Sequence, residues 1–316
     1  MPAKQFEGNP YGFASIYAYD DNGPVGVAIH GYDNNVGATG SAVDVYGGDG
    51  FSTVNIGLNN TLNIVLGGYG NTVSAPITAD ASIQTGTGGA NVYANVSDGY
   101  LIATGGYLNT ITETGGAGSI YAGDGSAVVS VAGGSGSVYA SGYNNVVNVG
   151  AGAYDVHAGA TAVINTTTVG GSTLTAEGYG NQFNLNGSGL NVAGPYDVVN
   201  AGAGTDTVSL SGGSAGINLA GWGNTVNLSN AYAIITDGAG STVFNLGDNS
   251  IVGIQGFQSS DQIVFKAGGG INTAQDALSH ATTIATGVEI DFGGGTTLQI
   301  AGISPTDLTA ANFKAV

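Results

Sequence analysis

Short runs of alternating apolar and polar residues follow one another along most of the chain, and glycine stands at their ends. Examples are TVNI at 53–56 and TLNI at 61–64, and the first apolar residues of such runs recur about every nine positions. Successive side chains of a strand point to opposite faces, so this alternation predicts strands of about four residues. Helices are disfavoured, because each glycine costs a helix ~1 kcal/mol relative to alanine.

The alternation also assigns the two faces of each predicted strand. Thr, Asn and Ser between the apolar residues are expected to face outward. The apolar positions are expected to face a common core, as at Val54/Ile56, Leu62/Ile64, Val147/Val149 and Val226/Leu228. One such strand cannot bury its inner face alone, so the core is expected to form only when successive coils stack.

A longer repeat of the form glycine, aromatic, any residue, asparagine, any residue, apolar is superimposed on the short one, and most copies are about 36 residues apart. Its aromatic residues are Tyr32, Tyr69, Tyr107, Tyr143, Tyr179 and Trp222. Its asparagines are Asn34, Asn71, Asn109, Asn145, Asn181 and Asn224. Short strands joined by tight glycine-rich turns in regular repeats are typical of a parallel β-solenoid.

Two coil sizes agree with this repeat. Turns such as GGDGFSTV at 47–54 and AGDGSAVV at 122–129 lie halfway between copies of the aromatic repeat. They have a similar glycine-rich sequence but lack the aromatic residue. We therefore favour a coil of about 18 residues, in which the aromatic corner recurs in every second turn. The alternative is a coil of about 36 residues, in which the aromatic residues stack at every rung.

The repeated corner has structural and functional interpretations. The asparagines are expected to form a hydrogen-bonded ladder along the solenoid. The aromatic side chains either stack on their counterparts, which stabilises by ~0.5–1.5 kcal/mol per pair beyond burial, or face outward to bind sugar or another subunit.

Composition excludes several classes of protein. The 316 residues include 3 Lys and Arg against 21 Asp and Glu, for a formal net charge of -18, and no cysteine. Nucleic acid and anionic lipid headgroups need a basic surface, so neither is expected as a partner. No apolar window is long enough for a membrane span, and no cleavable signal peptide is visible at the start.

Two stretches resemble the RTX (repeats-in-toxin) family. AGAGTDTVS at 201–209 and GGDGFSTVN at 47–55 are similar to its nonapeptide GGxGxDxUx, and residues 288–313 look like the tail of such proteins. The resemblance implies a parallel β-roll with calcium in the turns, for which Asp206 and Asn224 are the candidate ligands. It also implies export by a type I system without an N-terminal signal peptide, to the cell surface or the extracellular space.

The chain is expected to have three parts. Residues 1–30 form an N-terminal cap, residues 31–256 the solenoid, and residues 257–316 a small mixed C-terminal cap with the secretion signal. The last part contains a helix-like stretch near 273–285, followed by the strands VEIDF and TTLQI joined by GGG.

No enzymatic activity is expected. The histidines His30, His157 and His280 are far apart in sequence, and no nucleophile or phosphate-binding motif is present. A polysaccharide lyase is disfavoured because the chain has no arginine and no lysine between Lys4 and Lys266.

We expect a secreted structural or adhesive protein that assembles with itself into a filament, sheet or matrix, with calcium assisting. The alternative is a carbohydrate- or surface-binding module that uses the Tyr/Trp row, with surface glycans as partners.

Overall fold

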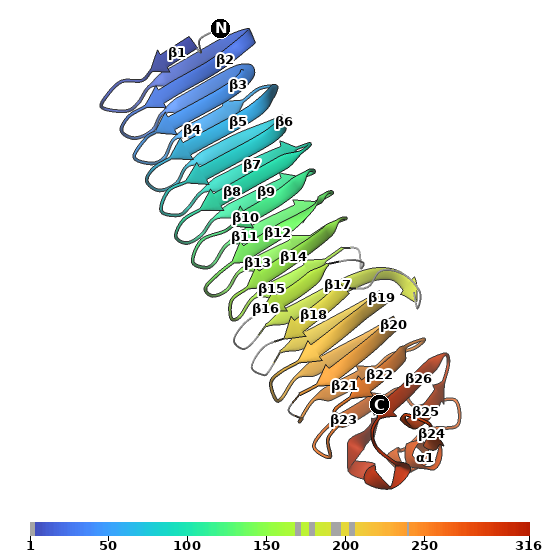
Figure 1. The fold of residues 1–316 in the computed structure, drawn as a ribbon. Coiled ribbons are helices and arrows are strands. Elements are labelled where there is room, and N and C mark those ends of the chain that lie inside the picture. Colours follow the sequence, from blue (N-terminus) through green and yellow to red (C-terminus); the bar gives the residue numbers. More distant parts are fainter. Residues whose placement is uncertain (1–3, 168–171, 177–180, 191–196, 202–205, 239) are drawn as a thin grey trace. The chain divides into compact units, whose positions relative to one another are not determined.

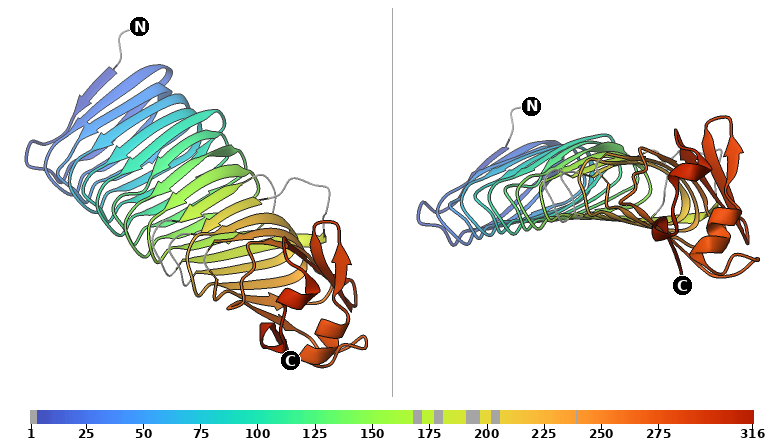
Figure 2. Two further views of the ribbon diagram at one scale, coloured as in Figure 1. Left: turned by 60° about the horizontal axis from the view of Figure 1, so that its bottom comes forward. Right: turned by 90° about the horizontal axis from the view of Figure 1, so that it is seen from below.

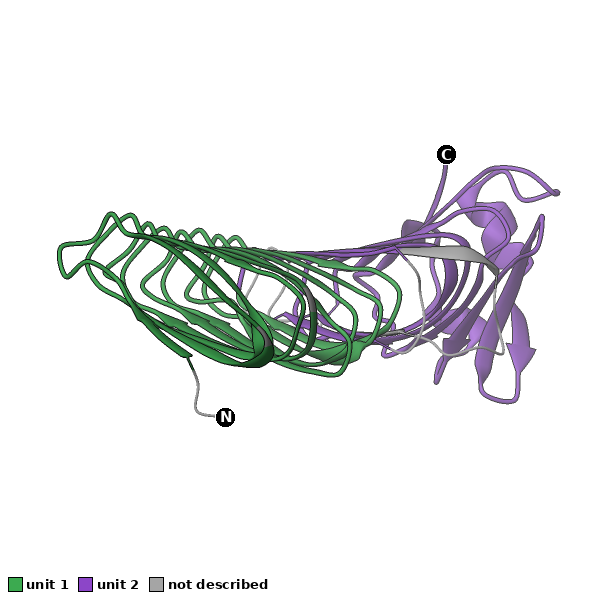
Figure 3. Cartoon of the chain, turned by 90° about the horizontal axis from the view of Figure 1, so that it is seen from above, with its two compact units in different colours: residues 1–159 green, residues 160–316 purple. Residues whose placement is uncertain are grey.

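The chain folds as an all-β parallel β-solenoid with about 19 residues per turn. The computed structural model describes residues 4–167, 172–176, 181–190, 197–201, 206–238 and 240–316. The chain divides into two compact units, residues 1–159 and residues 160–316 (Figure 3). The predicted fold class and the shorter of the two coil sizes are confirmed.

Unit 1 stacks its strands in parallel (Figure 1). They are β1 (Lys4–Glu7), β2 (Ser15–Ile29), β3 (Asn35–Gly47), β4 (Thr53–Ile56), β5 (Asn59–Leu66), β6 (Thr72–Thr85), β7 (Asn91–Val96), β8 (Gly99–Thr104), β9 (Thr110–Thr114), β10 (Ala117–Tyr121), β11 (Val128–Ala132), β12 (Ser135–Ala140), β13 (Val146–Val149) and β14 (Ala153–Ala158). The segment expected as an N-terminal cap supplies β1 and β2, and β2 pairs in parallel with β3.

The core of each coil is filled by the inward-facing residues of its strands. All eight positions assigned to the core from the alternation are buried, with at most 3% of the side chain exposed. Residues between them on the same strands are partly or fully exposed, as the burial pattern of β4 shows. Stacked coils share these apolar columns, so the interior is continuous along each unit.

Unit 2 begins with the same parallel stacking. Its strands are β15 (Val163–Thr166), β16 (Thr173–Ala176), β17 (Gln182–Leu190), β18 (Asp197–Ala201), β19 (Thr207–Leu219), β20 (Thr225–Asp237), β21 (Val243–Leu246), β22 (Ile251–Gln255), β23 (Gln262–Phe265), β24 (Thr282–Ile284), β25 (Gly287–Gly293), β26 (Thr296–Ala301) and β27 (Phe313–Ala315).

The end of unit 2 departs from the coil pattern, as predicted for a small mixed cap (Figure 2). Strands β24, β25 and β26 pair antiparallel, while β26 continues the parallel column of β22, and β27 that of β23. The predicted helix is the short α1 (Ala274–Ser279), which is followed later by the 3₁₀ helices η1 (Pro305–Asp307) and η2 (Ala310–Asn312). None of the helices in the described residues is long and apolar enough to cross a membrane.

Candidate functional site

Tyrosine and glycine alternate along one corner of unit 1. Parallel bridges link Gly12, Tyr32, Gly50, Tyr69, Gly88, Tyr107, Gly125 and Tyr143, each to the next. The half-repeats therefore occupy the same corner in alternate turns, as predicted from their likeness. Because a glycine turn separates consecutive tyrosines, the four tyrosines of unit 1 do not stack on their counterparts, and the stacking interpretation is wrong for this part of the corner.

The corner tyrosines face outward. Between 45% (Tyr69) and 62% (Tyr143) of each side chain is exposed. The Tyr69 ring lies against Gly89 of the next coil, where an added Cβ would come within 2.5 Å of the ring atom Cζ. Phe51 contacts Tyr69 edge to face, with ring centroids 6.0 Å apart. The Tyr69 ring is therefore held in place by Gly89 and Phe51, while almost half of its surface remains exposed.

The asparagine two positions after each tyrosine faces inward and holds the corner. Asn34, Asn71, Asn109 and Asn145 are at most 1% exposed. The side-chain amide Nδ2 of Asn109 donates to the carbonyl oxygen of Gly105 in its own turn, at 3.0 Å. Its Oδ1 accepts the backbone N–H of Ala90 from the preceding coil, also at 3.0 Å. The other three asparagines bond in the same way.

These bonds replace the expected ladder of asparagines bonded to each other at the corner. The intervening coils carry Ser52, Ala90 and Ala127 at the position of the asparagine, so the amide reaches backbone groups instead. Asparagine ladders do form on the outward sheet faces of unit 2, where Nδ2 of Asn245 donates to Oδ1 of Asn227 at 2.7 Å.

Unit 2 holds the remaining copies of the corner. Trp222 is 65% exposed, while Asn181 and Asn224 are buried. Oδ1 of Asn181 accepts the backbone N–H of Ala162 at 3.0 Å, as in unit 1. Tyr179 lies outside the described residues.

The candidate calcium ligands lie in adjacent coils, as the repeat predicts. The backbone N–H of Asp206 donates to Oδ1 of Asn224 at 3.0 Å, and Oδ1 of Asp206 accepts the N–H of Asn181 at 2.8 Å. Each of these two Oδ1 atoms therefore accepts a backbone N–H, as the corner asparagines of unit 1 do. A calcium ion would need more oxygen ligands than these two, because it prefers 6–8. Among the described residues no group of three or more His, Asp or Glu side chains is arranged to hold a metal. Residues 202–205 of this turn lie outside the described residues, and calcium binding stays a prediction.

One aromatic stack was not predicted from the sequence. Tyr121, Tyr139 and His157 occupy the same outward position on β10, β12 and β14. Their ring centroids are 4.9 and 5.1 Å apart, with interplanar angles of 11° and 6°. Nε2 of His157 also lies 3.1 Å from Oδ2 of Asp155. The sequence did contain a signal for this stack: the segments SIYAG, SVYAS and DVHAG recur every 18 residues and carry their ring at the same position.

A buried acid in the core of unit 1 was also missed. Glu113 is fully buried on β9, between Ala94 and Val131 of the adjacent coils. Burial raises the pKa of its carboxyl to about 7, and the backbone N–H groups of Val96 and Thr114 lower it only in part. The sequence could have revealed this buried acid, because Glu113 occupies an inward position of the alternating strand, two residues after the buried Ile111.

Two buried tyrosines face the same region of the core as Glu113. Tyr100, Gly118, Gly136 and Tyr154 form one column across four coils, so the tyrosines enclose the space left by two glycines. The Tyr154 hydroxyl donates to the carbonyl oxygen of Gly133 at 3.1 Å. Burial and, to a smaller extent, the Glu113 charge together raise the pKa of Tyr154 to about 12. The cluster is closed to solvent.

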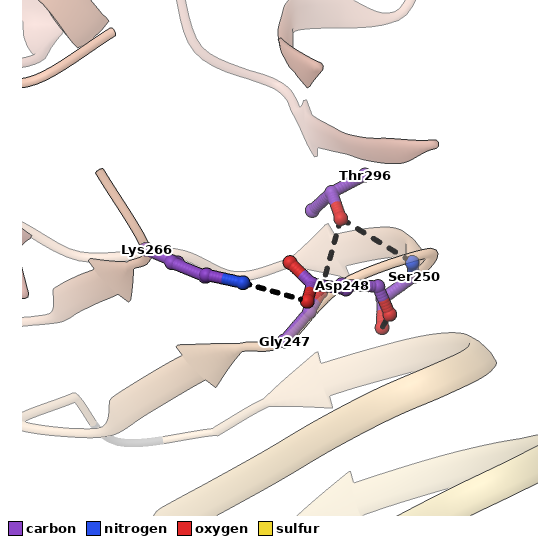
Figure 4. Close-up of polar contacts among 5 residues, drawn as sticks. All are labelled: Gly247, Asp248, Ser250, Lys266 and Thr296. Atoms are coloured by element: carbon purple, nitrogen blue, oxygen red, sulfur yellow. Dashed lines mark hydrogen bonds and ion pairs between the residues drawn. The ribbon is translucent and has the colours of Figure 1, made fainter. Parts of the chain in front are cut away.

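The last coil of unit 2 carries one of the three lysines (Figure 4). Nζ of Lys266 lies 2.9 Å from Oδ2 of Asp248, and both side chains are exposed. Beside them the Thr296 hydroxyl donates to the carbonyl oxygen of Gly247 at 3.0 Å and accepts the N–H of Ser250. The contacts of Thr296 attach β26 to the turn after β21, so we interpret them as structural.

No protein-family model, curated protein or solved structure matches the chain. The resemblance to the RTX family therefore rests on the motifs alone, and the candidate site is defined by its geometry. We refer to the row of Tyr32, Tyr69, Tyr107 and Tyr143 as the tyrosine ridge.

Proposed function

We propose that the chain is an extracellular structural and adhesive protein that acts through its repeated exterior and associates with further copies of itself. The observation that carries this proposal is the tyrosine ridge, which presents an exposed aromatic ring in every second coil of unit 1. Such an array suits an extended partner better than a small molecule, because its groups lie in a line instead of converging on a cavity.

The way the ridge is built supports binding. Each tyrosine is followed by a buried asparagine that bonds to two coils, so the backbone at the corner is fixed before a partner arrives. Tyrosine supplies a large contact area with few rotatable bonds, and little conformational entropy is lost on binding. Several such weak contacts on one rigid row add up through multivalency.

Charge gives the second argument. A net charge of -18 keeps separate copies soluble and apart. Divalent cations outside the cell screen that repulsion, so calcium is expected to favour association even without a dedicated site. Export to the cell surface or beyond, by the type I route that the motifs imply, belongs to the same proposal.

A carbohydrate-binding module is the second candidate, and the spacing of the ridge favours it. Two coils at ~4.8 Å per rung separate successive tyrosines by about 10 Å. An extended β-1,4-linked polysaccharide presents the same face of its sugar rings at a similar repeat. Each tyrosine could therefore meet every second sugar of one chain.

The test separates adhesion from self-association. Purified protein is followed by light scattering and electron microscopy with and without millimolar calcium, and its binding to insoluble β-linked polysaccharide is measured by pull-down. The double variant Tyr107→Ala/Tyr143→Ala is compared with Tyr93→Ala, which removes an exposed tyrosine from a sheet face instead of the ridge.

We expect calcium-dependent assembly of the wild type. Loss of polysaccharide binding in the ridge variant alone, with assembly intact, supports the second candidate. A wild type that neither assembles nor binds any surface contradicts the proposed function.

A further inference from the structure

Two aspartates stand between tyrosines of the tyrosine ridge. The glycine turns at Gly50 and Gly125 both read Gly-Asp-Gly, and they place Asp49 and Asp124 directly before the bridging glycine. Successive coils of the corner therefore carry an aspartate flanked by two tyrosines, in the series Tyr32, Asp49, Tyr69 and the series Tyr107, Asp124, Tyr143. Each aspartate is one coil, ~4.8 Å along the stack, from a tyrosine coil on either side. We refer to Asp49 and Asp124 as the ridge aspartates.

The backbone holds both ridge aspartates at the same place in their turns. The N–H of Asp49 donates to the carbonyl oxygen of Gly31 in the preceding coil, and the N–H of Asp124 donates to that of Gly106, both at 2.7 Å. In the following coil, an added Cβ on Gly68 would collide with the carbonyl group of Asp49. Because both neighbouring coils carry glycine there, no side chain at that position covers the aspartate, and both ridge aspartates are exposed.

The ridge aspartates have no cation beside them. Among the described residues the ion pairs use other acids, namely Glu7, Asp20, Asp155 and Asp248. Neither ridge aspartate accepts a hydrogen bond on its side chain within the described part of the chain. The net charge of -18 adds a negative potential over the whole surface. A row of exposed rings and carboxylates without an internal counter-ion attracts a positively charged partner.

An ammonium group is the cation that both kinds of side chain recognise. A carboxylate accepts its N–H groups in charge-assisted hydrogen bonds, and the face of a tyrosine ring attracts its charge. A calcium ion fits the ridge less well, because it prefers 6–8 oxygen ligands. Asp49 and Asp124 belong to coils four rungs apart, so they cannot share one ion.

The spacing of the ridge favours one class of polymer that carries ammonium groups. Successive tyrosines are two coils, about 10 Å, apart, which is similar to the repeat of an extended β-1,4-linked polysaccharide. A basic polypeptide carries the same charge, but in an extended strand the side chains on one face recur every ~6.8 Å. Such a strand falls out of step with the tyrosines after one repeat.

We propose that the tyrosine ridge binds a β-1,4-linked polysaccharide whose sugars carry free amino groups. The tyrosines contact every second sugar, and the ridge aspartates pair with the ammonium groups of sugars between them. This inference rests on the proposed function and names the class of polysaccharide for its second candidate.

Titration calorimetry of the full chain with two soluble hexamers tests the proposal at mildly acidic pH, where free amino groups are protonated. One is the β-1,4-linked glucosamine hexamer, and the other is the same hexamer with every amino group acetylated, which removes the charge. At one sugar per coil, each hexamer spans six coils of the ridge. We expect the glucosamine hexamer to bind about tenfold more tightly, because several weak charge contacts act together.

Variants of the ridge aspartates locate the effect. Asp49→Asn/Asp124→Asn should weaken binding of the glucosamine hexamer about 5- to 10-fold and leave binding of the acetylated hexamer unchanged. The control Asp44→Asn/Asp98→Asn removes the same charge from unit 1 away from the ridge, so its effect should be under about twofold. Circular dichroism checks that both variants keep their strands.

A third variant adds a charge to the ridge. Thr87 is exposed in the turn between Tyr69 and Tyr107, and its N–H donates to the carbonyl oxygen of Gly68 at 2.7 Å, as at the ridge aspartates. Thr87→Asp should therefore strengthen binding of the glucosamine hexamer about 2- to 3-fold. Thr61→Asp, which adds the same charge on β5, should not.

Three results would overturn the proposal: no binding of the glucosamine hexamer, equal binding of the two hexamers, or equal losses in the two double variants. A lysine hexamer that binds as tightly as the glucosamine hexamer, and loses as much in Asp49→Asn/Asp124→Asn, would assign the ridge to a basic polypeptide instead. Calcium-dependent assembly and binding of the acetylated hexamer report on the proposed function separately. Failure of amine recognition is therefore distinguishable from failure of the proposed function.

Discussion

Asn145 joins two coils, because its Oδ1 accepts the backbone N–H of Ala127 from the preceding coil at 3.0 Å. Its Nδ2 donates to the carbonyl oxygens of Ala140 and Ser141 in its own turn, at 2.9 and 2.8 Å. The side chain is fully buried. One neutral amide thus satisfies backbone groups from both coils that solvent does not reach.

Removing this amide should destabilise the solenoid. Asn145→Ala leaves the Ala127 N–H and two carbonyl groups without this partner, and we expect a loss of ~1–3 kcal/mol per unsatisfied buried group. Chemical denaturation followed by circular dichroism measures it. The control Asn148→Ala removes an outward amide on β13 that bonds to Ser130, and its effect should be smaller. Equal effects of the two variants would contradict the role of the corner.

The buried carboxyl of Glu113 should make stability depend on pH. Its pKa is raised from the usual value near 4.5 to about 7, so the fold favours the protonated form. The contribution to stability is then full below the unfolded pKa near 4.5 and is lost as the pH rises through 7. The full effect is about 3 kcal/mol.

Glu113→Gln isolates this effect from the repulsion among the other acids. The difference in unfolding free energy between the variant and the wild type should grow in favour of the variant between pH 4.5 and about 7, and level off above that range. The matched control is Asp98→Asn, which neutralises an exposed acid in the same unit. A difference that does not change with pH for Glu113→Gln would show that this carboxyl is ionised in the folded protein.

The glycines between the buried tyrosines should not tolerate a side chain. A Cβ on Gly118 would lie 2.0 Å from the carbonyl oxygen of Tyr100 and 2.6 Å from its ring atom Cδ2. We expect Gly118→Ala to cost ~1–3 kcal/mol through overpacking. Gly253 on β22 has open space around it, so Gly253→Ala should be neutral or stabilise by ~0.4–1 kcal/mol. Thermal unfolding of both variants tests this contrast, which fails if Gly118→Ala is as stable as the wild type.

The outer stack should contribute to stability through its central ring. Tyr139 stacks on Tyr121 on one side and on His157 on the other. Tyr139→Ala removes both contacts, and at ~0.5–1.5 kcal/mol each the loss beyond burial is about 1–3 kcal/mol. Tyr139→Phe keeps the ring and should stay within ~0.5 kcal/mol of the wild type. A Tyr139→Ala variant no less stable than Tyr139→Phe would show that the stack carries no energy.

Much of the fold follows from local pattern. Val54 and Ile56 alternate with polar neighbours, and this alternation alone fixes which face is buried. The likeness between the turns at 47–54 and 68–73 predicted that they share a corner, and Gly50 does bridge Tyr69. The asparagine at each corner was visible too, although its partners were predicted wrongly.

The rest depended on which residues stacking brings together. The length of each coil, about 19 residues, decides whether the neighbour of Tyr69 along the corner is another corner tyrosine or a glycine turn.

The sequence by itself determined the repeat, the strands and their inner faces, because period-two alternation and glycine turns act within a few residues. Only the tertiary structure decided that Glu113 shares a closed core region with Tyr100 and Tyr154, and that Tyr121, Tyr139 and His157 stack on one another. Those facts depend on contacts between coils about 19 residues apart. Neighbours at that separation are set by the exact length of every turn between them, and a single added residue changes which side chains meet.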